Sequence, residues 1–299
     1  MIERPGISVL ICTFNQEDYI EQAVRSALAQ NTSRNFEILV GDDCSTDKTV
    51  SIIKTIQDEF PEKLFIHSSA QNEGATRNLL RLISLAKGDY IAILDGDDYW
   101  NDPDKLQKQW DVITNDPSIG MVCSYASKWD QVNSKMIGLL GNDDVESFER
   151  LISGDSDVAA PTLFMKKDLL EKCIAQSQWY IEHNLFFDSV ISYWFAFYSR
   201  IHFIPESLAV YRVLPNSSCH STDARVSQLY QKRYFSIKLR FLLENPVSPD
   251  FAHATLINEW EKIKKYSSWS AETRIRASKV HRLGNLLLKP FRLIRRRRD

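Results

Sequence analysis

Three aspartates cluster around a glycine in the run Leu94-Asp95-Gly96-Asp97-Asp98. Carboxylates this close repel one another, so at least one of them is expected to face a cation. Hard divalent cations take oxygen ligands, and Mg²⁺ in particular binds through one or two carboxylates together with substrate phosphates. The cluster therefore indicates a metal-assisted site for a phosphorylated substrate. Taken alone, it also fits a solvated acidic turn after a strand.

Two further polar segments each follow an apolar run that is typical of a buried strand. The run 7–12 leads into residues 13–17, and the run 36–40 leads into residues 41–47. Continuous runs rich in β-branched residues suit strands that are buried on both faces. In an open sheet of parallel strands, ligands bind beyond the carboxyl ends of the strands. We therefore expect both polar segments and the acidic turn at 95–98 to meet in one crevice.

The elements around these segments predict an open α/β sheet. Apolar residues recur at helical spacing in 19–30 and in 75–86, and the short runs 64–67 and 90–94 favour strands. Strand and helix thus alternate through the first half of the chain. This alternation implies parallel strands that are joined by right-handed crossovers.

The second half of the chain is less regular. The pattern predicts a strand at 119–124, an irregular segment over 125–157 with a hairpin at 130–138, a helix over 183–199, and short strands at 201–204 and 208–212. From residue 222 onward the pattern is helical, with interruptions at two prolines.

The composition is that of an ordinary globular protein, with 43% hydrophobic and 25% charged residues among 299. A net charge of −2 gives no reason to expect nucleic acid as a partner. Five scattered cysteines form no CxxC pair and no zinc-ligand spacing, which favours reduced thiols. The N-terminus shows no signal peptide, and no apolar stretch approaches the ~20 residues that span a bilayer. We therefore expect a cytoplasmic protein.

Four motifs occur in the order and spacing of one enzyme family. They are SVLICTFN at 8–15, DDCSTD at 42–47, NEGATRN at 72–78 and DGDD at 95–98. Together they resemble the motifs of a family 2 glycosyltransferase of the GT-A fold, with Cys12 where the family usually has proline and Cys44 where it often has glycine. The resemblance is clear over about residues 7–125 and looser to about 220.

The resemblance implies a GT-A, Rossmann-like, mostly parallel open sheet with flanking helices. The glycosyltransferase domain would span 1–220, with a nucleotide-binding half at 1–125 and an acceptor-side half at 126–220. A helical C-terminal extension with a basic amphipathic tail would follow at 221–299.

By the same resemblance, the acidic turn binds a nucleotide-sugar donor with the help of Mn²⁺ or Mg²⁺. Asp97 would ligate the metal, Asp95 would hold the ribose or orient the donor, and Asp98 would reach the sugar or cap the following turn. His220 falls where some relatives place a metal or phosphate contact. Arg77 would neutralise phosphate or, alternatively, form an ion pair with Asp95.

The first two loops would hold the nucleotide. Thr13, Asn15 and Glu17 would line the base and ribose pocket. Asp43 resembles the residue that accepts a hydrogen bond from the uracil ring nitrogen, a role that suits a carboxylate. A UDP-sugar is therefore the expected donor.

The family places its catalytic base in the second half of the chain, near the start of a helix. Asp188 is the matching candidate, although Phe187 stands where the family often has an acid. It would take the proton of the acceptor hydroxyl in an inverting displacement. The alternative is that Asp188 only caps a helix, and Glu182 is the second candidate for the base.

These residues predict an inverting, metal-dependent glycosyltransferase that acts on a glycan or lipid-linked acceptor in polysaccharide biosynthesis. One alternative is a catalytically inactive nucleotide-sugar binding protein or partner subunit. Another is a nucleotidyltransferase, which would need a glycine-rich basic phosphate loop that residues 13–17 lack.

The C-terminal tail combines four arginines at 295–298 with apolar residues over 283–294. Such a basic amphipathic segment suits an anionic membrane surface. It predicts a cytoplasmic protein that is peripheral on the inner face of the cell membrane, where lipid-linked acceptors lie. A solvated end or adhesion to nucleic acid is the alternative.

Overall fold

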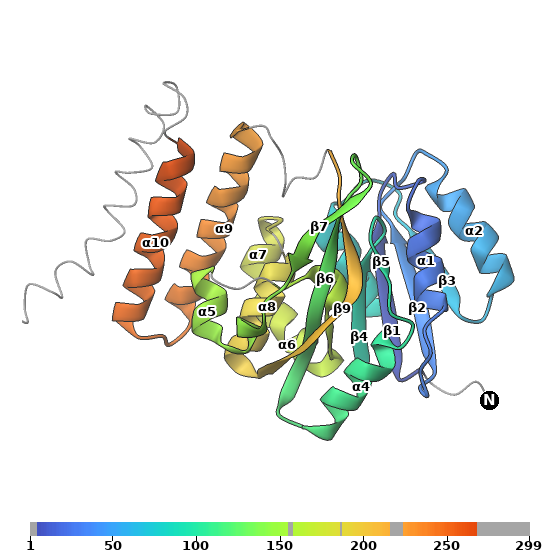
Figure 1. Cartoon of the computed structure of the whole chain (residues 1–299), viewed down its shortest axis with the longest axis horizontal. Coiled ribbons are helices and arrows are strands. Elements are labelled where there is room, and N and C mark those ends of the chain that lie inside the picture. Colours follow the sequence, from blue (N-terminus) through green and yellow to red (C-terminus); the bar gives the residue numbers. More distant parts are fainter. Residues whose placement is uncertain (1–4, 155–157, 186, 216–223, 268–299) are drawn as a thin grey trace, which may run out of the picture. The chain divides into compact units, whose positions relative to one another are not determined.

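The computed structural model describes residues 5–154, 158–185, 187–215 and 224–267 (Figure 1). The chain divides into two compact units, Met1–Leu214 and Pro215–Asp299. His220 and the basic tail lie outside the described residues, and every other residue predicted for the site lies in the first unit. The first unit has the predicted α/β architecture.

Four parallel strands form one half of the sheet, in the order β3-β2-β1-β4. They are β1 (Ile7–Thr13), β2 (Phe36–Asp42), β3 (Leu64–Ser68) and β4 (Tyr90–Asp95). Helices α1 (Ile20–Leu28), α2 (Thr49–Glu59) and α3 (Ala75–Leu85) connect them. All of β2 and nearly all of β1 are buried, which explains why the sequence of these strands reads as continuous apolar runs.

The other half of the sheet contains β5 (Tyr99–Trp100), β6 (Ile119–Asp130), β7 (Lys135–Leu140), β8 (Phe164–Lys166) and β9 (Arg200–Val213). The strand β8 pairs antiparallel with both β4 and β6, whereas β6 and β9 are parallel. The strand β5 pairs antiparallel with β9, and β7 forms an antiparallel hairpin with β6. The sheet is therefore mixed rather than mostly parallel, because the short strand β8 enters between the two halves in the opposite direction.

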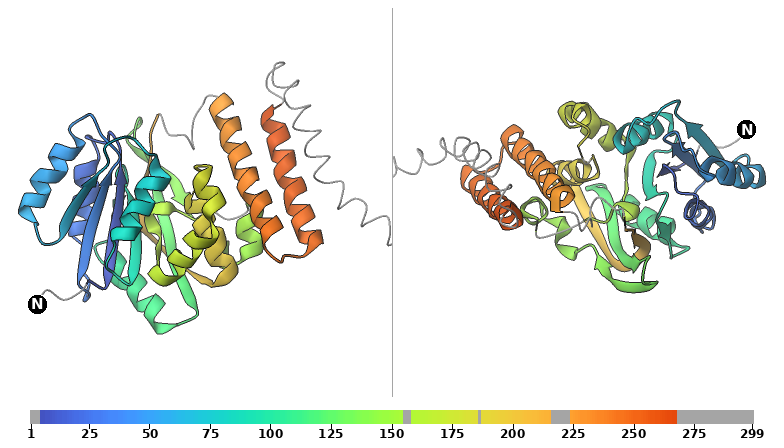
Figure 2. Two further views of the ribbon diagram at one scale, coloured as in Figure 1. Left: turned by 180° about the vertical axis from the view of Figure 1, so that it is seen from behind. Right: turned by 90° about the horizontal axis from the view of Figure 1, so that it is seen from above.

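Helices lie on both faces of the sheet (Figures 1 and 2). The second half of the first unit supplies α4 (Lys105–Asn115), α5 (Phe148–Ser153), α6 (Lys167–Gln176), α7 (Gln178–Glu182) and α8 (Phe187–Tyr198). The helix expected over 183–199 thus begins later, and the preceding segment contains Asn184 in a left-handed conformation with φ of 46°. The two strands expected at 201–204 and 208–212 form one strand, β9.

The sheet must curl, because a short connection joins two strands that are far apart in its order. The strand β5 is the last in the order and β4 is the fourth, with β8, β6 and β9 between them. Four strand spacings would separate β4 from β5 by about 19 Å in a flat sheet. Residues 96–98 are the whole connection, and four extended peptide steps span at most about 14 Å. The curl therefore brings β5 back toward the end of β4, and the acidic turn is the link between them.

The second unit contains the helices α9 (Ala224–Glu244) and α10 (Pro249–Ser267), which contact each other. The rings of Phe235 and Trp260 are 6.2 Å apart, and Lys238 forms a 2.9 Å ion pair with Glu259. The predicted helical extension is confirmed over these residues. Within the described part of the chain, no helix has the length and apolar character needed to cross a membrane.

Candidate active site

The acidic turn lies directly beyond the carboxyl end of β4. The Gly96 N–H donates to the carbonyl oxygen of Cys12 at 2.9 Å, and the Asp98 N–H donates to the carbonyl oxygen of Asp95 at 3.0 Å. A Cβ atom at Gly96 would lie only 2.9 Å from the Thr13 side chain. Glycine is therefore required here, because the turn packs against the first loop.

Three carboxyl groups lie close together at this turn, and the pKa of each is raised. Burial raises the pKa of the Asp95 carboxyl, and the charges of Asp97 and Asp188 raise it further. Burial also raises the pKa of Asp97 and of Asp98. One oxygen of Asp98, Oδ2, is buried without a hydrogen-bond partner among the described residues. Crowded carboxylates with an unsatisfied oxygen are the environment that a cation would stabilise.

A divalent cation fits this turn on the chemistry of the side chains. Within the described residues, no three histidine, cysteine or carboxylate side chains converge to hold a metal by themselves. Mg²⁺ is commonly bound by one or two carboxylates with substrate phosphates as the other ligands. Asp95 and Asp97 both remain partly exposed, whereas Asp98 is buried, so Asp95 and Asp97 are the carboxylates of the turn that are accessible for such a role.

Asn15 links the first loop, residues 13–17, to the second loop, residues 41–47, by hydrogen bonds. The Asn15 N–H donates to the Ser45 hydroxyl at 2.8 Å, and the Asn15 side-chain oxygen accepts from the Thr46 N–H at 2.8 Å. Asn15 has a positive φ of 51°, a conformation that asparagine tolerates better than most residues. The structure therefore brings the two predicted loops together, and it gives Asn15 a structural partner there.

Glu17 and Thr13 also make bonds within these loops. A Glu17 carboxylate oxygen accepts from the Lys48 N–H at 2.9 Å, and the Glu17 N–H donates to Asp47 at 3.1 Å. The buried Thr13 hydroxyl donates to the Gln16 side chain at 2.8 Å. The polar groups of this loop thus hold the loop itself in shape, and their contact with a nucleotide stays a prediction.

Asp43 is buried beneath the loop that contains Glu73 and Gly74. Its oxygens accept from the N–H groups of Glu73 and Gly74, both at 2.8 Å, and from the Ser69 hydroxyl at 3.3 Å. A carboxylate has about four acceptor positions, so these three bonds leave about one for a ligand. The assignment of Asp43 to a uracil base stays a prediction, and the structure adds a role in loop anchoring.

An arginine that the sequence analysis did not single out lies beside the carboxyl end of β2. Arg77 is exposed and makes no ion pair with Asp95 or with any other described residue. Arg81, one helical turn further along α3, donates from Nη2 to the carbonyl oxygens of Asp42 and His67, both at 3.1 Å, and to Asn78 at 2.7 Å. Its spacing of three from Asn78, a motif residue, is the signal that could have found it.

Asp188 lies in the first turn of α8. Its carboxylate accepts hydrogen bonds from its own N–H and that of Ser189, which lower its pKa, whereas burial raises that pKa more strongly. The residue nevertheless keeps exposed surface. Its charge raises the pKa of Asp95, so the structure places Asp188 near the acidic turn. Glu182, the other candidate base, is exposed at the end of α7.

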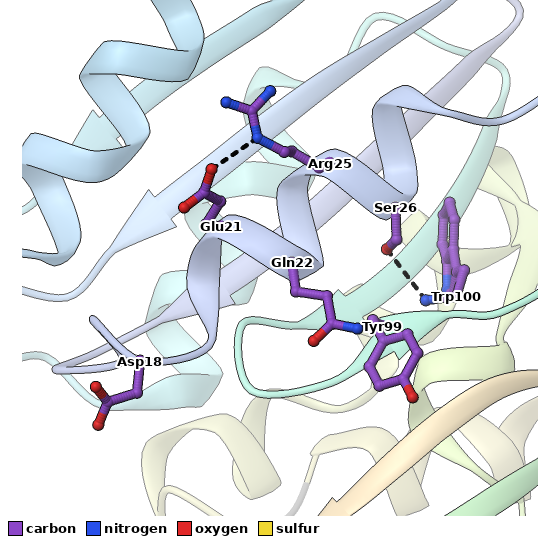
Figure 3. A pocket seen from close by; sticks show the side chains of 7 residues that line it. All are labelled: Asp18, Glu21, Gln22, Arg25, Ser26, Tyr99 and Trp100. Atoms are coloured by element: carbon purple, nitrogen blue, oxygen red, sulfur yellow. Dashed lines mark hydrogen bonds and ion pairs between the residues drawn. The ribbon is translucent and has the colours of Figure 1, made fainter.

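A recess of about 600 Å³ opens between α1 and β5 (Figure 3). It is lined by Asp18, Glu21, Gln22, Arg25, Ser26, Tyr99 and Trp100. None of the residues predicted for the site lines it. It borders the acidic turn, since Tyr99 directly follows Asp98 in the chain.

The curled α/β sheet with a carboxylate turn beyond β4 defines a GT-A glycosyltransferase domain. Residues 8–173 match the family model described as glycosyl transferase family 2. An uncharacterized glycosyltransferase of Nostoc sp. is 30% identical over 241 residues, which cover 78% of this chain and 72% of that protein. The chain belongs to glycosyl transferase family 2, as the sequence motifs predicted.

Other relatives match a smaller part of the chain. An uncharacterized protein of Mycobacterium tuberculosis is 36% identical over 111 residues, which cover 37% of this chain and only 32% of that relative. WfaP of Escherichia coli is named as a UDP-Glc:alpha-D-GlcNAc-diphosphoundecaprenol beta-1,3-glucosyltransferase, and it is 40% identical over 94 residues, or 31% of this chain and 36% of WfaP.

Two solved structures have the same fold at low sequence identity. S. aureus TarS 1-349 in complex with UDP-GlcNAc has a TM-score of 0.63 and 17% identity, with 89% of this chain and 73% of that chain covered. Mannosyltransferase PcManGT from Pyrobaculum calidifontis in complex with GDP-Man and Mn²⁺ has a TM-score of 0.59 and 16% identity, with 98% and 83% covered. These similarities confirm the predicted GT-A fold.

Proposed function

We propose that this chain transfers a sugar from a nucleotide-sugar donor to a hydroxyl group of a glycan or lipid-linked acceptor, with inversion at the anomeric carbon. The observation that carries the proposal is the proximity of Asp188 to the acidic turn at Asp95. An inverting displacement needs one group that stabilises the leaving diphosphate and another that takes the acceptor proton. The acidic turn after β4 and Asp188 on α8 are two carboxylate sites on separate elements that would supply both.

UDP is the proposed nucleotide. Asp43 retains about one acceptor position, which suits the ring N–H of uracil. WfaP is named for UDP-Glc, and TarS was solved with UDP-GlcNAc, whereas PcManGT was solved with GDP-Man. A guanine nucleotide is therefore the main alternative outcome when donors are compared.

Mn²⁺ or Mg²⁺ is the proposed cofactor, with Asp97 as the direct ligand and Asp95 beside it. The raised pKa values of these carboxyls and the unpaired Asp98 Oδ2 support a positive charge at the turn. A bound cation would supply the charge that stabilises the departing diphosphate. His220 is a proposed additional contact of the metal or phosphate.

Asp188 is the proposed base. A carboxylate oxygen of Asp188 accepts the proton of the acceptor hydroxyl while the hydroxyl oxygen bonds to the anomeric carbon and the bond to the diphosphate breaks. Burial raises the pKa of Asp188, which makes its carboxylate a stronger base than an exposed aspartate. The two N–H groups at the start of α8 hold the carboxylate in place.

The acceptor is proposed to be part of a surface polysaccharide that is assembled on a lipid carrier, as the name of WfaP describes for that enzyme. The basic tail would then keep the protein on the inner face of the cell membrane. Deletion of residues 286–299 should release the protein from anionic liposomes and leave donor hydrolysis intact. Unchanged liposome binding would refute the role of the tail.

A panel of nucleotide sugars tests the proposed function directly. With Mn²⁺ present, the matching donor should raise the melting temperature of the protein, since a specific ligand stabilises the folded state. Slow hydrolysis of the same donor should require the metal. Binding without hydrolysis would favour an inactive nucleotide-sugar binding protein, and release of pyrophosphate from a nucleoside triphosphate would favour a nucleotidyltransferase.

A further inference from the structure

We propose that Arg212 is a positioning residue that holds the acidic turn in the shape required to bind the cation. This inference rests on the proposed function of the turn. Arg212 is the penultimate residue of β9, and it is far from the turn in sequence. Only 6% of the residue is exposed, so its contacts are those of a packed side chain.

Arg212 contacts two consecutive residues of the turn. Its backbone N–H donates to the Asp98 Oδ1 atom at 2.8 Å. Its side-chain Nη1 donates to the carbonyl oxygen of Asp97. One bond therefore fixes a side chain of the turn, and the other fixes the backbone of the residue proposed as metal ligand.

The guanidinium group is itself held from three directions. Its carbon lies 4.7 Å from the centre of the Tyr99 ring and 5.2 Å from that of Tyr19. Its Nη2 atom donates to the side-chain oxygen of Gln22 on α1. Figure 3 shows Gln22 and Tyr99 close together at the wall of the recess between α1 and β5. The turn is thus connected through Arg212 to β5, to α1 and to the loop before α1.

These contacts use properties that only arginine has. Its planar guanidinium presents several N–H donors in a fixed geometry and stacks on aromatic rings, whereas lysine offers a compact point charge.

A purely structural role in sheet pairing does not account for this side chain. The strands β5 and β9 are already paired through Tyr99 with Val210 and through Trp100 with Ala209. The Arg212 side chain instead reaches the carbonyl group of the turn and the side chain of α1. Partners that orient metal ligands in this way typically change metal affinity or activity by about 10–100-fold when they are mutated.

The test compares three variants of the full chain in the presence of UDP. Arg212→Lys keeps the positive charge and removes the planar guanidinium group with its several donors. Gln22→Ala removes one hydrogen-bond partner of that group. Arg200→Lys is the matched control. Arg200 is also on β9, but it is exposed and pairs with Asp116 at 2.8 Å. Free Mn²⁺ is measured by electron paramagnetic resonance during a titration, and folding is checked by the melting temperature.

Arg212→Lys should raise the apparent Kd for Mn²⁺ about tenfold or more, with a smaller rise for Gln22→Ala and none for Arg200→Lys. A folded Arg212→Lys variant with the Mn²⁺ affinity of the wild type would overturn the inference. If that variant does not fold, Gln22→Ala decides: a raised Kd supports the inference and an unchanged Kd overturns it. Failure of the wild-type protein to bind Mn²⁺ with UDP would instead refute the proposed function.

Discussion

Asp188, in the first turn of α8, lies near enough to Asp95, at the end of β4, for its negative charge to raise the pKa of the Asp95 carboxyl. The segment before α8 is held beside α3 by a 3.3 Å bond from the Thr76 hydroxyl to the Leu185 carbonyl oxygen. Tertiary packing of the second half of the chain thus brings a carboxylate close to the acidic turn of the first half.

The Asp97→Ala substitution should abolish metal-dependent binding of UDP. The substitution removes the proposed direct ligand, and Asp98 is buried and cannot replace it. Calorimetric titration of UDP with and without Mn²⁺ measures the effect. Binding that still depends on the metal would move the ligand to Asp95 or elsewhere.

The Asp188→Asn substitution should leave donor binding intact and reduce sugar transfer by about 10²–10⁴-fold, the usual contribution of a general base. Glu182→Gln is the matched control and should transfer sugar at the rate of the wild type. The measurement is a transfer assay alongside a donor-binding titration. The opposite pattern of rates would make Glu182 the base.

The Asp95→Asn substitution should stabilise the metal-free protein at pH 8 and have less effect at pH 5. Burial and neighbouring charges raise the folded-state pKa of Asp95 above its ordinary value of 3.8. Such a group favours the folded state only while it is protonated, and that contribution is lost as the pH rises through the folded-state pKa. Melting temperatures without metal at the two pH values test this.

Asp58→Asn on the exposed face of α2 is the control for that experiment and should show no such pH dependence. Addition of UDP and Mn²⁺ should stabilise the wild type more than the Asp95→Asn variant, because the ligands compensate the repulsion that the substitution relieves. Equal melting temperatures at pH 8 would contradict the proposed crowding of charge.

Lys105 should make the stability of the first unit depend on pH. It is fully buried on α4, donates to Gln109 at 2.6 Å and lies 4.2 Å from the centre of the Trp100 ring. Burial lowers its pKa from 10.5 to about 7. Between these values the unfolded chain binds more protons than the folded one, so the Lys105 contribution to stability increases with pH.

The Lys105→Met substitution should remove this dependence. The free energy of unfolding of the variant relative to the wild type should fall as the pH rises from 7 to 10, by at most about 1.4 kcal/mol per pH unit. Lys54→Met on the exposed surface of α2 is the control. A constant difference between variant and wild type in urea unfolding would show that Lys105 is charged throughout.

The parallel half of the fold could be predicted because each of its strands and helices shows a clear pattern within its own short stretch of sequence. Each buried strand there is a short apolar run, and each connection is a helix with regular spacing. The insertion of β8 could not be predicted, since three residues of strand carry almost no periodicity and their partners are chosen by tertiary packing. The interruption before α8 depends on the left-handed backbone of Asn184, which the sequence does not announce.

The candidate site follows the same division. The sequence predicted that the acidic turn and the first two loops meet, because the ends of parallel strands share an edge of the sheet. It could not show that Asn15 and Glu17 bond to residues about 30 positions away, since those contacts depend on loop geometry. The contacts of Arg212 with the acidic turn could not be predicted either, because the two segments are more than 100 residues apart in the chain.

The acidic turn is a short covalent link between β4 and β5, two strands that are not neighbours in the sheet. Residues 96–98 bridge strands that are four places apart in the sheet, so they close a ring that hydrogen bonds alone leave open. The position of the acidic turn therefore depends on the curl of the sheet as well as on the turn itself. An insertion of two glycines after Asp98 would let the ring expand, and the fourth and last strands would separate at the point where the cation is proposed to sit.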